Sequence, residues 1–264
     1  WPIKYQLVTD YEIVGLGVTG NLLAILTTGT PYLCQGSHPE NMQLERMDVN
    51  LPCLSGAGVV DMGGTIAYPS PEGLVAMTSG SPTILTGALF TRKQWEKLNP
   101  STFDAAHHAG RYVFYHTPTG ETDPVLGIID PSGPAYIQTD LPPGPLRYDL
   151  ESGDLYMVNL SGKVKIFDDI SMNYRNLTWR SGEFFTPAPV SYGVCMVEGE
   201  ELESPSNFSV SIYRDGELIL TSSIMNDFFR LPAGLGSRWE VEIYGKVRVD
   251  RFALAGEPSD LMQG

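Results

Sequence analysis

Apolar residues in the first two thirds of the chain occur in short runs that end in turns rich in Gly, Pro, Ser or Asn. Runs of this length predict β-strands, because a helix needs a longer periodic segment. Consecutive runs group into four units, each built as strand, turn, strand, Ser/Thr-Gly turn and strand. The first strands of these units are expected at 12–16, 65–68, 111–116 and 146–150.

Two of these units repeat each other without a gap. Thr27–Pro31 (TTGTP) matches Thr78–Pro82 (TSGSP) at an offset of 51 positions. Two further units carry corresponding turns, Asp130–Gly133 (DPSG) and Asn159–Gly162 (NLSG). Repeats of about 40 to 50 residues with several strands are typical of β-propeller blades. Stacked blades bury faces that a single meander would leave exposed.

A G-x-G-x-x-G sequence, Gly15–Gly20, lies at the start of the first unit. This pattern binds a dinucleotide pyrophosphate when it leads into a helix. The run that follows, Leu22–Leu26, has the length of a strand and ends in a turn. We therefore assign these glycines to a strand and its turn, and we predict no cofactor-binding site.

The segment between the second and third units has a different composition. Thr91–Leu98 and Ser101–His108 resemble short helices separated by Asn99-Pro100, and Ser101 is a candidate N-cap for the second helix. We expect one or two short surface helices inserted between blades.

From about Ile170 the pattern changes to alternating apolar and polar positions. Phe208–Tyr213 alternates, reverses at Arg214–Glu217 (RDGE) and returns as Leu218–Ser222, and Asp-Gly between such strands is a strong hairpin signal. Further strands are expected at 178–185, 190–198, 239–244 and 247–254. The predicted fold is therefore all-β. Propeller-like blades with a short helical insertion span 1–170, and a small antiparallel sandwich-like region spans 171–264. Four units are few for a closed ring, so either unrecognised strands or a missing N-terminal part would complete it.

The charge balance excludes a protein that grips duplex DNA. The chain has 31 acidic and 17 basic residues, a net charge of −14, and no cluster of Lys and Arg. An acidic surface repels nucleic acid and anionic membranes, and it suits a surface past which DNA slides. No apolar run approaches the roughly 20 residues of a membrane helix. The start at Trp1, without Met, is expected of a mature product or a fragment of a longer chain.

No group of residues predicts catalysis or metal binding. His107, His108 and His116 form the only histidine cluster, but neighbouring residues of a helix point about 100° apart. Three acids of one turn lack the order of a calcium loop and are expected to be solvated: Asp149, Glu151 and Asp154. We expect a protein that is not an enzyme and has no catalytic, cofactor-binding or metal-binding residues.

The remaining candidates for chemistry are better explained by burial. Cys34, Cys53 and Cys195 are odd in number and lack a C-x-x-C spacing, so we expect buried free thiols. Trp179 and Trp239 are expected to fill the core of the C-terminal sandwich rather than to stack on a sugar.

Several stretches resemble tail proteins of tailed bacteriophages: YEIVGLGVTGNLLAILTTGTPYLCQGSHPENM, VVDMGGTIAYPSPEGLVAM, ALFTRKQWEKLNPSTFDAAHHAGRYVFYH, NLTWRSGEFFTPAPVSYG and RWEVEIYGKVRVDRFALAGEPSDL. The most similar type is the propeller-containing nozzle or tail-tube subunit of short-tailed phages, and the resemblance spans nearly the whole chain. It implies a virion structural protein that forms a homo-oligomeric ring around the DNA exit channel. Its implied partners are other tail or portal-adaptor proteins and genomic DNA that passes without tight binding. The resemblance implies no catalytic residues.

Two other functions fit the same pattern. A propeller can bind or cleave carbohydrate, as a receptor-binding or glycan-processing protein, and the many acids could supply paired carboxylates. A propeller can also serve as a general interaction module for one soluble partner.

Overall fold

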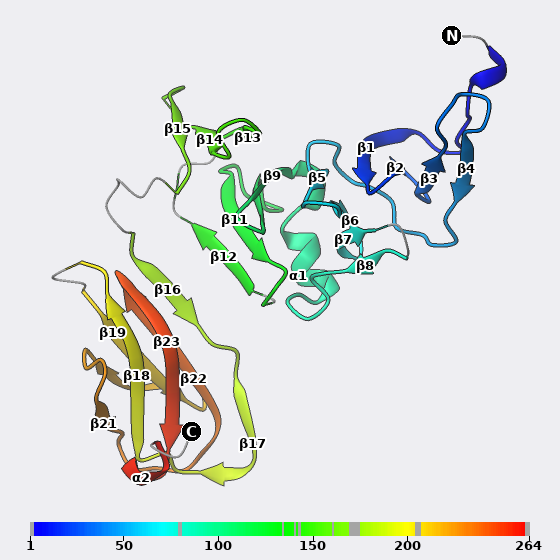
Figure 1. Ribbon diagram of the computed structural model, residues 1–264. Coiled ribbons are helices and arrows are strands. Elements are labelled where there is room, and N and C mark those ends of the chain that lie inside the picture. The colour runs from blue at the N-terminus through cyan, green and yellow to red at the C-terminus, as the bar shows by residue number, and fades with distance from the viewer. Residues whose placement is uncertain are drawn as a thin grey trace. The chain divides into compact units, whose positions relative to one another are not determined.

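The computed structural model describes residues 3–78, 81–133, 135–139, 141, 144–159, 161–168, 175–203 and 207–261. Strands predominate among them, so the predicted all-β class is confirmed. The chain divides into two compact units, Trp1–Asp169 and Ile170–Gly264, which are considered separately (Figure 1). We call them unit 1 and unit 2.

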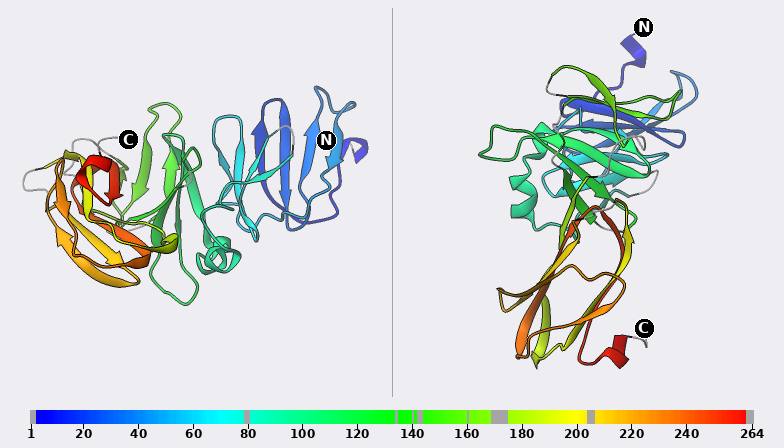
Figure 2. Two further views of the ribbon diagram at one scale, coloured as in Figure 1. Left: turned by 90° about the horizontal axis from the view of Figure 1, so that it is seen from below. Right: turned by 90° about the vertical axis from the view of Figure 1, so that its left-hand side faces the viewer.

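The described part of unit 1 contains four antiparallel sheets that follow one another along the chain, and we call them blades 1 to 4 (Figure 2). Blade 1 contains β1 (Ile13–Thr19), β2 (Leu22–Thr27), β3 (Tyr32–Gln35) and β4 (Gln43–Arg46). Blade 2 contains β5 (Val60–Asp61), β6 (Ile66–Ser70), β7 (Gly73–Met77) and β8 (Thr83–Ile84). Blade 3 contains β9 (Asp104–His108), β10 (Arg111–His116), β11 (Val125–Asp130) and β12 (Ala135–Thr139). Blade 4 contains β13 (Leu146–Tyr148), β14 (Leu155–Val158) and β15 (Val164–Ile166).

Each blade contains the predicted three-stranded meander: β1–β3, β6–β8, β10–β12 or β13–β15. A fourth strand, which the sequence patterns did not predict, extends three of them. It is β4 beside β3 in blade 1, β5 beside β6 in blade 2 and β9 beside β10 in blade 3.

The blades pack on one another through their apolar faces. Directly opposed residues of an antiparallel pair lie on one face of the sheet. In blade 2, Ile66 opposes Met77, and both belong to the core cluster shared with blade 1. Leu74 lies on the opposite face and belongs to the cluster shared with blade 3. The core of unit 1 is therefore a series of layers between sheets.

One of the two predicted helices is confirmed. α1 (Arg92–Lys97) begins after Thr91, whose hydroxyl accepts from the Gln94 backbone while the Gln94 side chain accepts from the Thr91 backbone, a capping box. Trp95 anchors the helix by donating from its indole Nε1 to the Ser70 carbonyl at 2.7 Å. The short 3-10 helix η1 (Ile3–Tyr5) precedes blade 1.

The predicted helix at Ser101–His108 is wrong. A single 3-10 turn, η2 (Pro100–Thr102), follows Asn99, whose φ of 55° reverses the chain, and Ser101 is not its N-cap. The next residues form β9, which pairs with β10 along its whole length. Ala105 and Ala106 favoured a helix, but sheet pairing with a buried neighbour outweighs that weak propensity.

The described part of unit 2 contains two antiparallel sheets. One contains β16 (Leu177–Arg180), β17 (Phe184–Val190), β19 (Ser209–Arg214), β20 (Glu217–Ser222) and β22 (Gly236–Gly245). The other contains β18 (Val194–Glu201), β21 (Phe228–Arg230) and β23 (Val247–Ala255). Residues of both sheets share one core cluster, in which Val197 and Phe229 meet Trp239 and Val241. This packing is that of the predicted sandwich. The short helix α2 (Pro258–Leu261) follows β23.

The hairpin predicted at Arg214–Glu217 is confirmed. Asp215 and Gly216 have φ of 53° and 89°, the two positive angles of a type I′ turn. The strand expected at 178–185 is instead divided between β16 and β17, which both pair with β22. Proline is tolerated at Pro187 and Pro189 because β17 lies at the edge of its sheet.

The glycines of Gly15–Gly20 allow blade 1 to approach blade 2. A Cβ at Gly15 would lie 2.7 Å from Val59 Cγ2, and a Cβ at Gly17 would lie 2.7 to 2.9 Å from three carbons of Ile66. Gly20 has a φ of 60° and forms the turn into β2. The assignment of this pattern to a strand and its turn is therefore confirmed, because β2 follows it directly.

Gly17→Ala is expected to lower the free energy of unfolding of unit 1 by about 1–3 kcal/mol, because the added methyl overpacks the layer against Ile66. Urea unfolding followed by tryptophan fluorescence measures this change. Gly133→Ala is the matched control, since no heavy atom lies within 4 Å of its added Cβ. Equal stability of the two variants would contradict the tight approach of blades 1 and 2.

Candidate functional site

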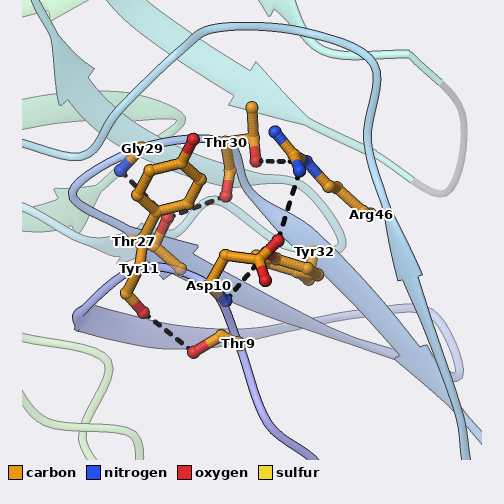
Figure 3. Close-up of polar contacts among 8 residues, drawn as sticks. All are labelled: Thr9, Asp10, Tyr11, Thr27, Gly29, Thr30, Tyr32 and Arg46. Carbon is orange, nitrogen blue, oxygen red and sulfur yellow. Dashed lines mark hydrogen bonds and ion pairs between the residues drawn. The ribbon is translucent and has the colours of Figure 1, made fainter.

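A polar cluster around Asp10 holds the N-terminal segment against blade 1 (Figure 3). The Tyr32 hydroxyl donates to Asp10 Oδ2 at 2.9 Å and accepts from the Asp10 backbone N–H at 3.1 Å. Arg46 Nη1 lies 3.2 Å from the same carboxylate oxygen, and Arg46 Nε donates to Thr30 Oγ1 at 3.1 Å. Tyr32 and Arg46 oppose each other in β3 and β4, so the strand register brings both donors to Asp10.

The repeated Thr-Thr-Gly turn provides the second attachment of this segment. The Thr27 hydroxyl donates to the Thr30 carbonyl at 2.7 Å and accepts from the Gly29 N–H at 3.1 Å. The Tyr11 ring covers Gly29 so closely that a Cβ there would lie 2.5 Å from Tyr11 Cγ (Figure 3). Glycine at this position is therefore required by close approach of an aromatic ring.

The face of blade 1 opposite to blade 2 is apolar and partly open. We call it the leading face, defined by Leu16, Val18, Leu23, Ile25, Tyr32 and Cys34. Ile25, Tyr32 and Cys34 are buried, whereas Leu16 and Val18 of β1 are 58% and 57% exposed. Leu16 and Val18 alternate with Gly15 and Gly17, so glycine packing against blade 2 forces them to point away. The sequence patterns predicted a strand at 12–16 but did not indicate which of its faces is covered.

The last blade of unit 1 has a second open apolar face. We call it the trailing face, defined by Tyr156, Val158, Val164 and Ile166, which share one side of β14 and β15. Val164 is 65% exposed and Ile166 is 41% exposed. The other side of blade 4 is buried against blade 3. The leading and trailing faces lie at opposite ends of the row of blades in unit 1 (Figure 2).

A groove of about 570 Å³ runs past β5, β9 and β13 in unit 1. Its polar lining includes Asp61, His107 and Tyr148. The Asp61 carboxylate accepts from the backbone N–H groups of Gly63 and Gly64 at 2.8 and 3.2 Å, and His107 Nε2 accepts from the Gly110 N–H at 3.1 Å. These hydrogen bonds stabilise local turns. The groove is therefore polar at its edges, but Asp61, His107 and Tyr148 are not hydrogen-bonded to one another as a catalytic pair would be.

The three clustered histidines do not converge on one point. His107 and His108 lie on β9 rather than on a helix, and successive strand residues point to opposite faces. His108 packs edge-on against Phe167, with ring centroids 5.5 Å apart. His116 is buried in blade 3, with Nδ1 2.6 Å from the Leu98 carbonyl oxygen. Within the described residues, no three His, Cys, Asp or Glu side chains are placed to hold a metal ion.

The acids at 149–154 cap their own turn. The Asp149 carboxylate accepts from the backbone N–H groups of Ser152 and Glu151 at 3.2 and 3.4 Å. Hydrogen bonds from Ser152 hold the pKa of Asp149 below its ordinary value. Glu151 is exposed and Asp154 is half-buried, so the turn that Asp149 closes lies at the surface.

All three cysteines are free and buried, as predicted. Burial raises the pKa of Cys53 to about 11 and the pKa of Cys195 to about 12. Both therefore stay protonated near neutral pH, whereas a nucleophile or metal ligand requires a thiolate. Their role in the described structure is to fill the core.

The two tryptophans of unit 2 have different environments. Trp239 is fully buried in the core cluster, as predicted, but Trp179 is 40% exposed and its assignment to the core was wrong. Trp179 lies on the edge strand β16, 5.5 Å from Phe252 between ring centroids. It lines a groove of about 270 Å³ together with Phe252, Asp250 and Arg251. Alternation along a strand determines the face of a residue, but it does not show whether the strand lies at an edge.

Comparison with protein-family models and with curated proteins finds no match to this chain. Among the residues that the structure describes, no helix is both long and apolar enough to cross a membrane. The basis for a functional assignment is therefore the geometry of the blades, the charge of the chain and the resemblance in sequence.

Tyr32→Phe is expected to loosen the segment before β1, because Asp10 loses a donor to its carboxylate and an acceptor for its N–H. Amide hydrogen exchange of the peptide around Asp10 should accelerate by about tenfold, since two hydrogen bonds worth roughly 0.5–1.5 kcal/mol each are lost. Tyr5→Phe is the control, since Tyr5 bonds to Glu40 instead. Unchanged exchange around Asp10 would contradict the role of Tyr32.

His116 is expected to make unit 1 less stable in acid. Burial lowers the pKa of His116 below the ordinary value of 6.5. Just below pH 6.5, His116 is therefore protonated in the unfolded chain but still neutral in the folded chain. The stability contribution is fully present above pH 6.5. It is lost as the pH falls below that value, by at most about 1.4 kcal/mol per pH unit, until the folded state is also protonated.

His116→Asn removes this titration and retains a side-chain donor for the Leu98 carbonyl. Its free energy of unfolding, measured in urea between pH 7 and pH 5, should fall less steeply than that of the wild type. Parallel pH profiles for the two proteins would show that His116 does not have a lowered pKa.

Proposed function

We propose that the protein is a virion structural protein of a phage tail, a subunit of an oligomeric ring that lines the DNA exit channel. The assignment to a phage tail rests on the resemblance of stretches such as YEIVGLGVTGNLLAILTTGTPYLCQGSHPENM. The assignment to an assembly is carried by one observation: both ends of the row of blades expose apolar side chains. Leu16 and Val18 lie at one end, and Val164 and Ile166 at the other.

These side chains favour assembly because of their position in the fold. Isolated apolar residues are common at protein surfaces, but neighbouring apolar residues on the face of a sheet indicate a surface that a partner covers. The opposite faces of the same two blades are already buried by this type of contact. A subunit that binds its neighbours through two different surfaces forms a ring when the rotation from one subunit to the next adds up to a full turn.

The charge of the chain suits a channel through which DNA moves. At a net charge of −14, Asp and Glu that face the lumen repel the phosphates of the duplex. Few counterions would be released, so DNA would not be held. Other tail or portal-adaptor proteins are the proposed partners of the ring, and the virion is its proposed location. The role requires no catalytic residue.

A second candidate function, carbohydrate binding, is favoured by the groove beside Trp179. The indole of Trp179 and the ring of Phe252 line it with the charged residues Asp250 and Arg251. Aromatic rings stack on the apolar faces of sugars, and charged side chains bind hydroxyl groups. The rings of Trp179 and Phe252 are inclined by 53°, however, so they do not form a flat platform. Ring formation therefore remains the leading proposal.

Negative-stain electron microscopy of the purified protein is expected to show rings with a central opening. Fluorescence anisotropy with labelled duplex DNA should detect no binding at physiological salt in the range of about 10⁻⁴–10⁻⁶ M that is typical of non-specific DNA-binding proteins. A monomer at high concentration, or tight binding to duplex DNA, would contradict the proposed function. Binding on a glycan array that Trp179→Ala abolishes would favour the second candidate.

A further inference from the structure

We infer that the trailing face of one copy docks on the leading face of a second copy, and that this contact repeats the junction between blades 2 and 3. The inference rests on the proposed function in taking the ring to consist of identical subunits. It identifies the two faces that join them.

The leading face corresponds to the face of blade 2 that meets blade 3. At the offset of 51 positions, Leu23 and Ile25 of β2 correspond to Leu74 and Ala76 of β7. Leu23 and Ile25 point away from blade 2, on the leading face. Leu74 points away from blade 1, into the core cluster shared with blade 3. The counterpart of the leading face on blade 2 is therefore already buried within the chain, by blade 3.

The trailing face corresponds to the face of blade 3 that meets blade 2. The turns that end in Gly133 and Gly162 place β14 at an offset of 29 positions from β11, so Val158 corresponds to Ile129. Ile129 is fully buried in the core cluster that contains Leu74 of blade 2. Val158 and its neighbours on β15 instead form the trailing face.

The two open faces are thus counterparts of two faces that meet inside the chain. Within unit 1 they lie at opposite ends of the row of blades, where Leu16, Val18 and Val164 are all more than half exposed. A second copy can bring a trailing face to the open part of a leading face, at Leu16 and Val18. The contact joins two different surfaces, so it propagates from copy to copy and closes only as a ring.

Two double variants test the inference. Leu16→Glu with Val18→Glu places charges on the leading face, and Val164→Glu with Ile166→Glu does the same on the trailing face. Sedimentation velocity of the full chain should show each variant as a monomer where the wild type is oligomeric. Leu218→Glu, 55% exposed in unit 2, is the matched control and should assemble normally.

Mixing the two double variants gives the decisive result. Each retains one intact face, so an equimolar mixture should form a heterodimer and no larger species. Self-association of either double variant would overturn the pairing of leading with trailing face. A mixture that stays monomeric, although both variants keep wild-type circular dichroism and melting temperature, would also overturn it.

The outcome for the wild type separates this inference from the proposed function. A wild-type oligomer that all of the face variants preserve would overturn the inference and leave the ring proposal standing. If the mixed variants form the expected heterodimer but the wild type forms open filaments, the inference is supported and the proposed ring is contradicted. A wild-type monomer at high concentration would overturn both.

Discussion

The structure of unit 1 depends on the burial of thin antiparallel meanders against one another. A sheet of three or four short strands has two faces, and apolar residues on both faces are stable only when neighbouring sheets cover them. Blade 2 shows the result: Tyr68 and Val75 pack towards blade 1, while Ala67 and Leu74 pack towards blade 3. At the two ends of the row no neighbouring sheet covers the outer face, and Leu16 and Val164 stay exposed. Assembly is therefore proposed to take place through these two faces.

Much of the fold could be predicted from the sequence because the strands are short and their turns are chemically distinct. The Asp215-Gly216 turn and the helix at Thr91–Leu98 were readable from a few neighbouring residues, whereas the Thr91 capping box was not predicted. The strand β9 was not, because Ala105, Ala106 and His107 carry no strand signal of their own and depend on pairing with β10. Local propensity is outweighed where long-range pairing buries both partners.

The candidate site was harder to predict, because it depends on which side of a sheet is covered. The alternation of Leu16 and Val18 with two glycines indicates opposite faces, but only the contact of Gly17 with Ile66 shows which face is buried. Asp10, Tyr32 and Arg46 are far apart in sequence and meet through the register of β3 and β4. Trp179 differs from Trp239 only by lying on an edge strand, and no pattern within either strand distinguishes them.

The packing of β1 on blade 2 can be tested directly with an engineered disulfide. A Cβ at residue 15 would lie 3.5 Å from Val59 Cβ, at the short end of the range of about 3.5–4.5 Å found in disulfides. The double variant Gly15→Cys with Val59→Cys should form this bond on mild oxidation of the folded protein, detected by mass spectrometry as a cross-linked peptide. A folded variant in which the two introduced thiols stay reduced, or pair only with the native Cys34 or Cys53, would contradict the face-to-face packing of the blades.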